Sequence, residues 1–491
     1  MILLNLNEEL YENDLRALLM AFYPGNTIMR KKTEGLSVDC ALTVQYDREA
    51  SCVSMTLEND DAVVTKQTKV CFADKKQGKI DTKTLLYQIC VEVTKRELPW
   101  GTLTGIRPTK IAMTMLEQGK SEQEIRDYME HIMLCGEEKT ELSLDIAKRE
   151  QSILKTFDYK NGYSLYIGIP FCPTTCAYCS FTSYPISKWH SQVDEYLEHV
   201  EMELDYIARQ FHGRALHTVY FGGGTPTTLE PYQLDRILTK VEQTFDLSNC
   251  IEFCVEAGRP DSITREKLQT LKNHAVTRIS INPQTMKEET LKRIGRRHTV
   301  DQVKEAYWLA REVGFTNINM DMILGLPNET EDDIHKTLEQ LKQLAPDNLT
   351  VHSLAIKRAA RLNTQKESFA DTKSINSEAI VKMTADYAKQ MGMKPYYLYR
   401  QKNMTGNMEN VGYAVQGKEG IYNILIMEEL QTIVGVGAGA TTKAVFGNRI
   451  ERAENVKDVA TYIQKTQEMI ERKKKLFTVK MAESGIESQN K

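Results

Sequence analysis

A single pattern repeats from Leu165 to Leu354: a short apolar run, a loop of Gly, Pro or polar residues, and a stretch with apolar residues three and four positions apart. The run is typical of a buried strand and the stretch of an amphipathic helix. The predicted strands are Leu165–Ile169, Thr218–Phe221, Ile251–Val255, Arg278–Ile281, Ile318–Ile323 and Leu349–Leu354. The clearest predicted helices are Asp194–Gln210, Leu234–Phe245, Val303–Val313 and Asp332–Leu344. Strands alternating with helices predict a parallel sheet, and hence an α/β fold with an open or partial (β/α)6 barrel.

The chain before Leu165 has a different pattern. Val38–Leu57 and Ala62–Phe72 alternate apolar and polar residues like strands of an antiparallel sheet, and Thr82–Arg96 then predicts a helix. The polar stretch Lys148–Lys160 is a candidate linker. This part is therefore predicted to be a separate α+β domain.

The periodicity weakens after Leu354. A helix is predicted near Ser377–Gln390, and Tyr396–Ala414 is rich in loop-forming residues. A chain of 491 residues suggests about three domains at roughly 150 residues each. The predicted division is an N-terminal α+β domain (1–155), a partial barrel (156–360) and a smaller C-terminal domain that covers the substrate (361–491).

The charge balance excludes some partners. Lys and Arg number 63 against 67 Asp and Glu, so the net charge of -4 supplies no general attraction to nucleic acid or to an anionic membrane. The first residues have no basic region of a secretion signal, and no uncharged apolar stretch approaches the ~20 residues of a membrane helix. We expect a soluble, cytoplasmic protein that binds neither nucleic acid nor membrane.

Three of the ten cysteines lie within eight residues, at Cys172, Cys176 and Cys179. In a reducing compartment such a cluster is more often a metal or redox site than a set of disulfides. The C-x3-C-x2-C spacing suits an iron–sulfur cluster with one iron left open for a small ligand. A catalytic zinc also has three protein ligands and an open position, and it is the alternative. The x3 spacing and the lack of a neighbouring His favour the cluster.

Residues of unusual chemistry follow several predicted strands directly. The Cys cluster follows the first strand, Gly222–Gly224 the second, Glu256 ends the third, and Gln284 follows the fourth. The carboxyl ends of parallel barrel strands are where active sites are built. These residues therefore point to one shared site.

The segment Phe171–Cys179, with an aromatic residue just before its last Cys, resembles the signature of the radical SAM superfamily. The resemblance implies a 4Fe-4S cluster bound by Cys172, Cys176 and Cys179, whose open iron holds the amino and carboxylate groups of S-adenosyl-L-methionine (SAM). It also implies reductive cleavage of SAM to Met and a 5′-deoxyadenosyl radical, which abstracts hydrogen from the substrate.

Further segments resemble the coproporphyrinogen dehydrogenase branch of that superfamily. They are a G-G-G-T-P run, the Glu of E-A-x-x-P, the Gln of R-I-S-x-x-x-Q, the Arg of I-G-R and the Asp of D-x-I-x-G-L-P. Tyr166 matches a family tyrosine close to the cofactor and is the predicted catalytic residue. The SAM-binding residues that the resemblance implies are Gly222, Gly223, Gly224, Thr225, Glu256, Gln284, Arg296 and Asp321.

Three segments outside the barrel motifs, Pro99–Lys110, His352–Arg358 and Tyr399–Tyr413, are similar to the HemZ-like group of this branch. That similarity implies an oxidoreductase of porphyrin and haem biosynthesis, which decarboxylates coproporphyrinogen III oxidatively to protoporphyrinogen IX without oxygen. It implies a flavodoxin or ferredoxin as electron donor, and we expect a monomer. Basic side chains could fix the substrate carboxylates, and the candidates are Lys357, Arg358 and Arg400.

Some positions depart from the family pattern. Gly168 stands where the well-studied enzymes have His, and Phe181 where they have a further Cys, so binding of a second SAM stays open. Haem chaperones of the group carry H-N-x-x-Y-W, whereas Glu409–Ala414 lacks both the His and the Trp, which disfavours haem transfer through that motif. The alternatives are a haem or tetrapyrrole chaperone and another radical SAM enzyme that modifies a tetrapyrrole.

Overall fold

The chain forms two compact units, Met1–Arg149 with Tyr399–Asn403, and Glu150–Leu398 with Met404–Lys491. The computed structural model describes residues 1–31, 37–105, 107–355, 360–364, 374–401, 408–447 and 449–483, the last five of these by their backbone alone.

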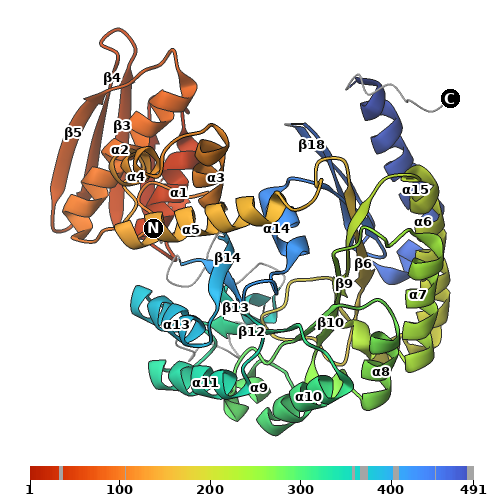
Figure 1. Cartoon of the computed structure of the whole chain (residues 1–491). Helices are drawn as coiled ribbons and strands as arrows, with labels where there is room; N and C mark the ends of the chain where they lie inside the picture. Colours follow the sequence, from red (N-terminus) through yellow and green to blue (C-terminus); the bar gives the residue numbers. More distant parts are fainter. Residues whose placement is uncertain are drawn as a thin grey trace. The chain divides into compact units, whose positions relative to one another are not determined.

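The first unit is built on a mixed five-stranded sheet of order β2-β1-β3-β4-β5, drawn in red and orange in Figure 1. β1 pairs in parallel with β2 and β3, while β3, β4 and β5 are antiparallel. This confirms the predicted antiparallel strands and the helix that follows them. The elements are β1 (Ile2–Leu6), α1 (Glu12–Phe22), β2 (Ile28–Met29), β3 (Cys40–Asp47), β4 (Cys52–Asn59), β5 (Val63–Lys69) and α2 (Lys75–Thr94).

In the described residues, α2 is followed by α3 (Thr109–Glu117), α4 (Glu122–Asp127), a short π-helix (Tyr128–Ile132) and α5 (Glu137–Leu154). The prediction of a linker over Lys148–Lys160 is therefore wrong for its first half, because helix α5 continues to Leu154. Leu144, Ala147 and Leu154 are buried at helical spacing among the charged residues of this helix. The high charge of the stretch had concealed that apolar face.

The second unit contains an eleven-stranded sheet of order β14-β15-β13-β12-β11-β10-β9-β6-β16-β17-β18. Its centre is six parallel strands, which confirm the six predicted ones and the α/β partial-barrel class. They are β6 (Tyr163–Ile169), β9 (Leu216–Gly223), β10 (Glu252–Gly258), β11 (Arg278–Ile281), β12 (Ile318–Leu324) and β13 (Asn348–Ser353).

Helices lie along the outer side of this curved sheet (Figure 1), as right-handed crossovers require. Strand residues such as Leu165, Val219 and Ile279 are wholly buried, since helices cover one face and the sheet curves around the other. The four predicted helices are confirmed. The helices are α6 (Val193–Gln210), α7 (Pro231–Thr244), α8 (Arg265–Asn273), α9 (Glu288–Arg293), α10 (Val300–Val313) and α11 (Glu331–Leu344).

The C-terminal third extends the same sheet at both edges. On one edge β15 pairs antiparallel to β13, and on the other β16 pairs in parallel with β6. The predicted helix near Ser377–Gln390 is confirmed, but the loop-rich Tyr396–Ala414 contains strand β15 and most of β14, which was not expected. The elements are α12 (Arg361–Thr364), α13 (Glu378–Gln390), β14 (Lys394–Tyr399), β15 (Asn410–Ala414), α14 (Ile421–Glu428), β16 (Thr432–Val436), β17 (Thr441–Phe446), β18 (Arg449–Glu454) and α15 (Val459–Glu483).

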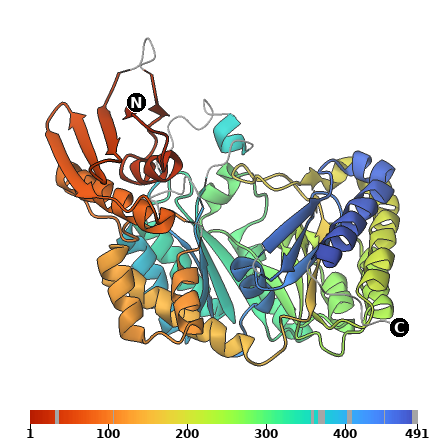
Figure 2. The same ribbon diagram turned by 90° about the horizontal axis from the view of Figure 1, so that it is seen from above.

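A buried charge cluster joins α15 to α6, which lie side by side in Figures 1 and 2. Lys473 on α15 contacts Glu203 on α6 with Nζ and Oε1 2.5 Å apart, and both side chains are fully buried. Tyr462 and Asn455 donate further hydrogen bonds to the same carboxylate. The last helix is thus fixed to the barrel wall by a fully paired charge.

Among the described residues, no helix has both the length and the apolar character needed to cross a membrane. The predicted boundaries at 155/156 and 360/361 stay predictions, as does the covering role given to residues 361–491.

Candidate active site

The Cys loop begins where β6 ends. Its first Cys lies in β7 (Phe171–Cys172), which pairs with β8 (Tyr184–Pro185). Cys176 is buried, while Cys172 and Cys179 are half-buried. The loop docks on the segment just before Arg296: the Ala177 N–H donates to the Ile294 carbonyl at 2.8 Å, and the Thr174 hydroxyl to the Gly295 carbonyl at 2.9 Å. Two motifs far apart in the sequence are thereby brought into contact.

The glycine run after β9 packs directly against the start of this loop. The Gly224 N–H donates to Ile169 O at 2.8 Å, and the Thr225 N–H to Phe171 O at 2.7 Å. A Cβ on Gly224 would lie 2.5 Å from Phe171 O, and Gly223 has a φ of +105°. Only glycines allow this close approach and this backbone conformation.

Glu256, near the end of β10, lies beside the same glycines. A Cβ on Gly222 would come within 3.2 Å of its carboxylate. The Tyr220 hydroxyl donates to Glu256 Oε1 at 2.5 Å. Burial, together with the negative charge of Asp321, raises the pKa of Glu256 to about 7. Its ionised form is therefore costly until a cation or a hydrogen-bond donor arrives.

Asp321, on β12, is the second carboxylate of the site. Asn319 Nδ2 donates to its Oδ1 at 2.7 Å, and His352 Nε2 lies 3.6 Å from its Oδ2. Burial raises the pKa of Asp321, but His352 and Asn319 outweigh that effect, so the pKa stays below its ordinary value. This carboxylate is held ionised and can accept hydrogen bonds, as ribose hydroxyls would offer.

Gln284 lies between these strands in an unusual conformation. Its φ is +69°, and its backbone is fixed by bonds from its N–H to Asp321 O and from the Ile323 N–H to its carbonyl, both 2.9 Å. The side chain is buried, yet Oε1 has no hydrogen-bond partner. Strain and an unsatisfied buried acceptor at one residue are typical of a ligand-binding position.

Arg296 follows the segment on which the Cys loop docks. It donates to the Asn282 carbonyl and, at 3.4 Å, to the hydroxyl of Tyr178, the aromatic residue before the last Cys. Its side chain is buried, and its Nε has no hydrogen-bond partner. The arginine thus joins the Cys loop to the loop after β11.

Tyr166, the predicted catalytic residue, is one of three tyrosines with stacked rings. Its ring centroid is 6.2 Å from that of Tyr220 and 6.4 Å from that of Tyr422, and the last two are 4.4 Å apart. A Cβ on Gly223 would lie 3.1 Å from the Tyr166 hydroxyl. Tyr166 therefore lies against the glycine run.

The candidate substrate residues are less informative. Lys357 and Arg358 lie outside the described residues. Arg400 belongs to the first unit, where it donates to Leu103 O at 2.7 Å and its guanidinium lies 5.7 Å from the centre of the Trp100 ring. All three stay predictions.

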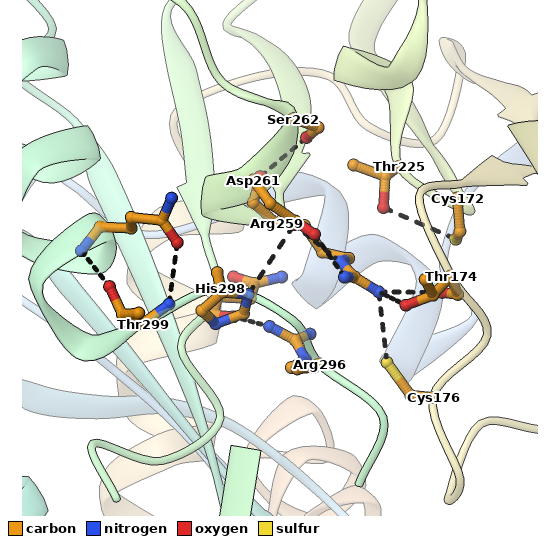
Figure 3. A network of polar contacts seen from close by, with 12 residues as sticks. Cys172, Thr174, Cys176, Thr225, Arg259, Asp261, Ser262, Arg296, His298 and Thr299 are labelled. Carbon is orange, nitrogen blue, oxygen red and sulfur yellow. Dashed lines mark hydrogen bonds and ion pairs between the residues drawn. The ribbon is translucent and has the colours of Figure 1, made fainter. Parts of the chain in front are cut away.

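Sequence reasoning missed Arg259, which lies between Asp261 and the Cys loop in Figure 3. Its Nη1 donates to Thr174 O at 2.9 Å and lies 4.0 Å from Cys176 Sγ. The available signal was a charged residue directly after a strand and inside the E-A-x-x-P segment. Tyr220, the partner of Glu256, was also missed, because its position within a strand made it resemble a core residue.

The sequence pattern of the Radical SAM superfamily matches residues 166–341, from Tyr166 past Asp321. Over 372 residues the chain is 42% identical to the oxygen-independent coproporphyrinogen-III oxidase-like protein HemZ of Bacillus subtilis (strain 168), a match covering 74% of each chain. The chain belongs to this HemZ-like family of radical SAM proteins. It is also 37% identical over 194 residues to the heme chaperone HemW of the same organism, covering 39% of this chain and 50% of that protein.

A solved structure has the same fold as this HemZ-like chain. It is the coproporphyrinogen III oxidase HemN from Escherichia coli, described as a radical SAM enzyme, with a TM-score of 0.52 and 23% identity. The alignment covers 65% of this chain and 73% of that one. At this identity the likeness confirms the fold alone.

Radical SAM proteins use a 4Fe-4S cluster and SAM, and these are the cofactors of the HemZ-like chain. In the part of the chain that the structure describes, no three His, Cys, Asp or Glu side chains converge on a position for a single metal ion. Each thiolate of an iron–sulfur cluster binds its own iron, so three separated thiols fit such a group. The glycine-lined cradle and the unsatisfied Gln284 Oε1 fit a polar ligand beside it.

Proposed function

We propose that this HemZ-like protein is a radical SAM oxidoreductase that decarboxylates coproporphyrinogen III oxidatively to protoporphyrinogen IX. The main support is the docking of the Cys loop on Ile294–Gly295, which gathers the predicted cluster ligands and SAM-binding residues at one edge of the sheet. The similarity to HemZ, a coproporphyrinogen-III oxidase-like protein, supports the tetrapyrrole substrate.

In this proposal Cys172, Cys176 and Cys179 hold the cluster. When bound, the cluster and SAM supply a one-electron cleavage that removes hydrogen from the substrate. Glu256 and Asp321 attract the cationic ligand, and the unpartnered oxygen of Gln284 accepts a hydrogen bond from it.

The remaining residues shape the site. The Gly222–Gly224 backbone allows close approach, and Tyr166 packs against that run beside the predicted ligand position. The proposed reaction requires that water and oxygen be excluded from its reactive intermediate. Electrons come from a flavodoxin- or ferredoxin-type donor, and Lys357, Arg358 and Arg400 remain the candidates for the substrate carboxylates.

The second candidate function is a haem chaperone, which the match to HemW supports over half of that protein. The segment corresponding to the chaperone motif is strand β15 and the residues before it. Here Glu409 is buried and its carbonyl accepts a 2.8 Å hydrogen bond from the Ser353 hydroxyl. A buried glutamate at the position of the motif's His offers no imidazole to haem iron.

The deciding experiment is product analysis by mass spectrometry after anaerobic cluster reconstitution, with SAM, a low-potential reductant and coproporphyrinogen III. We expect protoporphyrinogen IX, carbon dioxide, Met and 5′-deoxyadenosine. SAM cleavage with a different modified tetrapyrrole would disprove the decarboxylation and keep the enzyme class. Tight haem binding with a shifted Soret band and no SAM cleavage would favour the chaperone.

A further inference from the structure

The sulfurs of Cys172 and Cys176 each have a polar side chain beside them that does not belong to the Cys triad. The Thr225 hydroxyl lies 3.6 Å from Cys172 Sγ, and Arg259 Nη1 lies 4.0 Å from Cys176 Sγ. Hydrogen bonds to cluster sulfurs and nearby charges are the main means by which a protein sets a cluster's reduction potential.

Arg259 is held firmly in its place. Its side chain is only 3% exposed. Its Nε and Nη2 bind the two carboxylate oxygens of Asp261 at 2.9 and 2.6 Å, and its Nη1 binds the Thr174 hydroxyl at 2.7 Å. Figure 3 shows the guanidinium reaching from Asp261 toward Thr174 and Cys176. Such a two-sided anchor leaves little freedom for the charge to move away from the Cys loop.

Asp261 is itself supported from the opposite side. His298 Nδ1 lies 3.7 Å from Asp261 Oδ1, and the imidazole is completely buried. The positive end of the Arg259–Asp261 pair therefore faces Cys176. Because the guanidinium is nearer to the sulfur than the carboxylate is, its attraction for added negative charge exceeds the repulsion from Asp261.

Thr225 makes a weaker contact. Its backbone N–H is fixed to Phe171 O, and its side chain is 2% exposed. The hydroxyl therefore lies beside Cys172 Sγ and cannot easily rotate into solvent. Although the G-G-G-T-P resemblance suggests SAM binding, the observed partner of this side chain is a sulfur.

We propose that Arg259 and Thr225 are positioning residues that raise the reduction potential of the cluster, by directing a cation and a hydroxyl at the sulfurs of Cys176 and Cys172. One electron from a low-potential flavin or iron–sulfur donor adds one negative charge to the cluster, and both groups favour that charge. This inference rests on the ligation part of the proposed function and not on the identity of the substrate.

The test uses the full chain with reconstituted cluster and no substrate. Iron content and the midpoint potential, followed by electron paramagnetic resonance during a redox titration, are measured for Arg259→Gln, Arg259→Lys, Thr225→Val and Thr225→Ser. The matched control is Arg236→Gln, because Arg236 pairs with Glu201 between the outer helices at 2.7 Å.

For Arg259→Gln we expect a tenfold loss of preference for the reduced cluster, a fall of about 59 mV for a one-electron couple. Arg259→Lys keeps the positive charge, so we expect its midpoint potential to fall less than that of Arg259→Gln. In Thr225→Val a methyl group replaces the hydroxyl, and we expect the preference for the reduced cluster to fall about threefold, which lowers the midpoint potential by about 28 mV. Thr225→Ser and Arg236→Gln keep the wild-type potential.

Equal potentials in Arg259→Gln and wild type, or equal falls in Arg259→Gln and Arg259→Lys, would overturn the role of the charge. If Arg259→Gln assembles no cluster, the two Thr225 variants decide, and an unchanged potential in Thr225→Val rejects the proposal. Shifted potentials in a protein that never forms protoporphyrinogen IX would refute the proposed function and leave this inference standing.

Discussion

Strand β10 carries one glutamate at its first residue, Glu252, and another near its carboxyl end, Glu256. Only four positions separate them, yet the protein satisfies them differently. Glu252 has its partners within the protein. Its Oε2 accepts a hydrogen bond from the Ile421 N–H at the start of α14 at 2.5 Å, and Arg278 Nη1 lies 3.9 Å from its Oε1.

The end of the barrel around Glu252 is tightly closed. Arg278 Nη2 also donates to Asn348 Oδ1 at 3.3 Å, and a Cβ on Gly420 would come 1.9 Å from Arg278 Nη1. The first turn of α14 therefore fills this end without spare room. Its polar groups serve packing.

At the other end of the strand, around Glu256, buried polar groups lack a compensating charge or a hydrogen-bond partner. Burial and Asp321 raise the pKa of Glu256 to about 7, and Gln284 Oε1 and Arg296 Nε have no hydrogen-bond partners. Glu256 and Gln284 gain most from a ligand with a positive charge and hydrogen-bond donors, such as the ammonium group of SAM, whereas Arg296 Nε needs an acceptor, such as the SAM carboxylate. Glu252 Oε1 and Arg278 Nη1 also lack hydrogen-bond partners, but there a carboxylate and a guanidinium lie 3.9 Å apart and offset each other's charge. Glu256 instead faces a second carboxylate, Asp321, so the two ends differ in charge balance.

We expect the largest effect from replacing a cysteine at the ligand end, compared with replacing a cysteine at the closed end. Cys176→Ala removes a predicted cluster ligand, so we expect complete loss of the cluster's absorbance and iron after anaerobic reconstitution. Cys250→Ala is the matched control, because Cys250 lies just before β10 with its Sγ 3.3 Å from Glu252 O, and it should retain full absorbance. Equal loss in both variants would refute the ligand assignment.

The next largest effect is on stability at the closed end. Arg278→Met leaves Glu252 and Asn348 without their cation, and breaking a buried charge pair costs about 3 kcal/mol or more. Denaturant unfolding followed by circular dichroism should show that loss. Arg236→Met, on the outer helices, should change stability by less than about 1 kcal/mol. If Arg278→Met matched that surface control, the packing role of this end would be wrong.

The sequence predicts the barrel because parallel strands buried on both faces leave runs of apolar residues that few other structures need. It fails for β14 and β15, because β15 pairs with β13, which is distant in the sequence, and β14 joins the sheet only beside β15. Gly412 in β15 reads as a loop residue, yet Tyr397 occupies the space of its missing side chain, where a Cβ would lie 1.8 Å from the ring. Only the folded sheet reveals why that glycine belongs in a strand.

The site shows the same division. The Cys spacing carries its chemistry within eight residues and can be recognised directly. Arg259 cannot, because its contact with Thr174 spans 85 positions and depends on the short turn Pro260–Ser262 that follows it. Residues whose role lies in a single motif are predictable, whereas those that join two motifs need the fold.

A smaller effect is expected from Glu256→Gln. Ionised Glu256 should attract the SAM cation, so equilibrium dialysis of the reconstituted protein at pH 8 should show about tenfold weaker SAM binding, which corresponds to ~1.4 kcal/mol. The pKa of about 7 lies above the unfolded value of 4.5, so the folded state binds more protons between these values. Wild-type stability therefore falls as pH rises through this window.

In Glu256→Gln that fall should disappear, and SAM affinity should no longer rise between pH 6 and pH 8. Glu339→Gln is a suitable control, because Glu339 lies on α11 and accepts a hydrogen bond from Tyr387, away from the strand ends. An unchanged pH profile in Glu256→Gln would show that another group titrates.

The smallest effect concerns the link between the two ends. Tyr422, in the first turn of α14, stacks on Tyr220 with ring centroids 4.4 Å apart, and Tyr220 donates to Glu256. A double-mutant cycle with Tyr220→Leu and Tyr422→Leu should give a coupling energy of about 1 kcal/mol in unfolding experiments. Tyr422→Leu alone should also move the Glu256-dependent pH profile, because Tyr220 loses the ring that fixes its hydroxyl. Additive stabilities with an unmoved profile would mean that the closed end and the ligand end act independently, despite sharing the same strands.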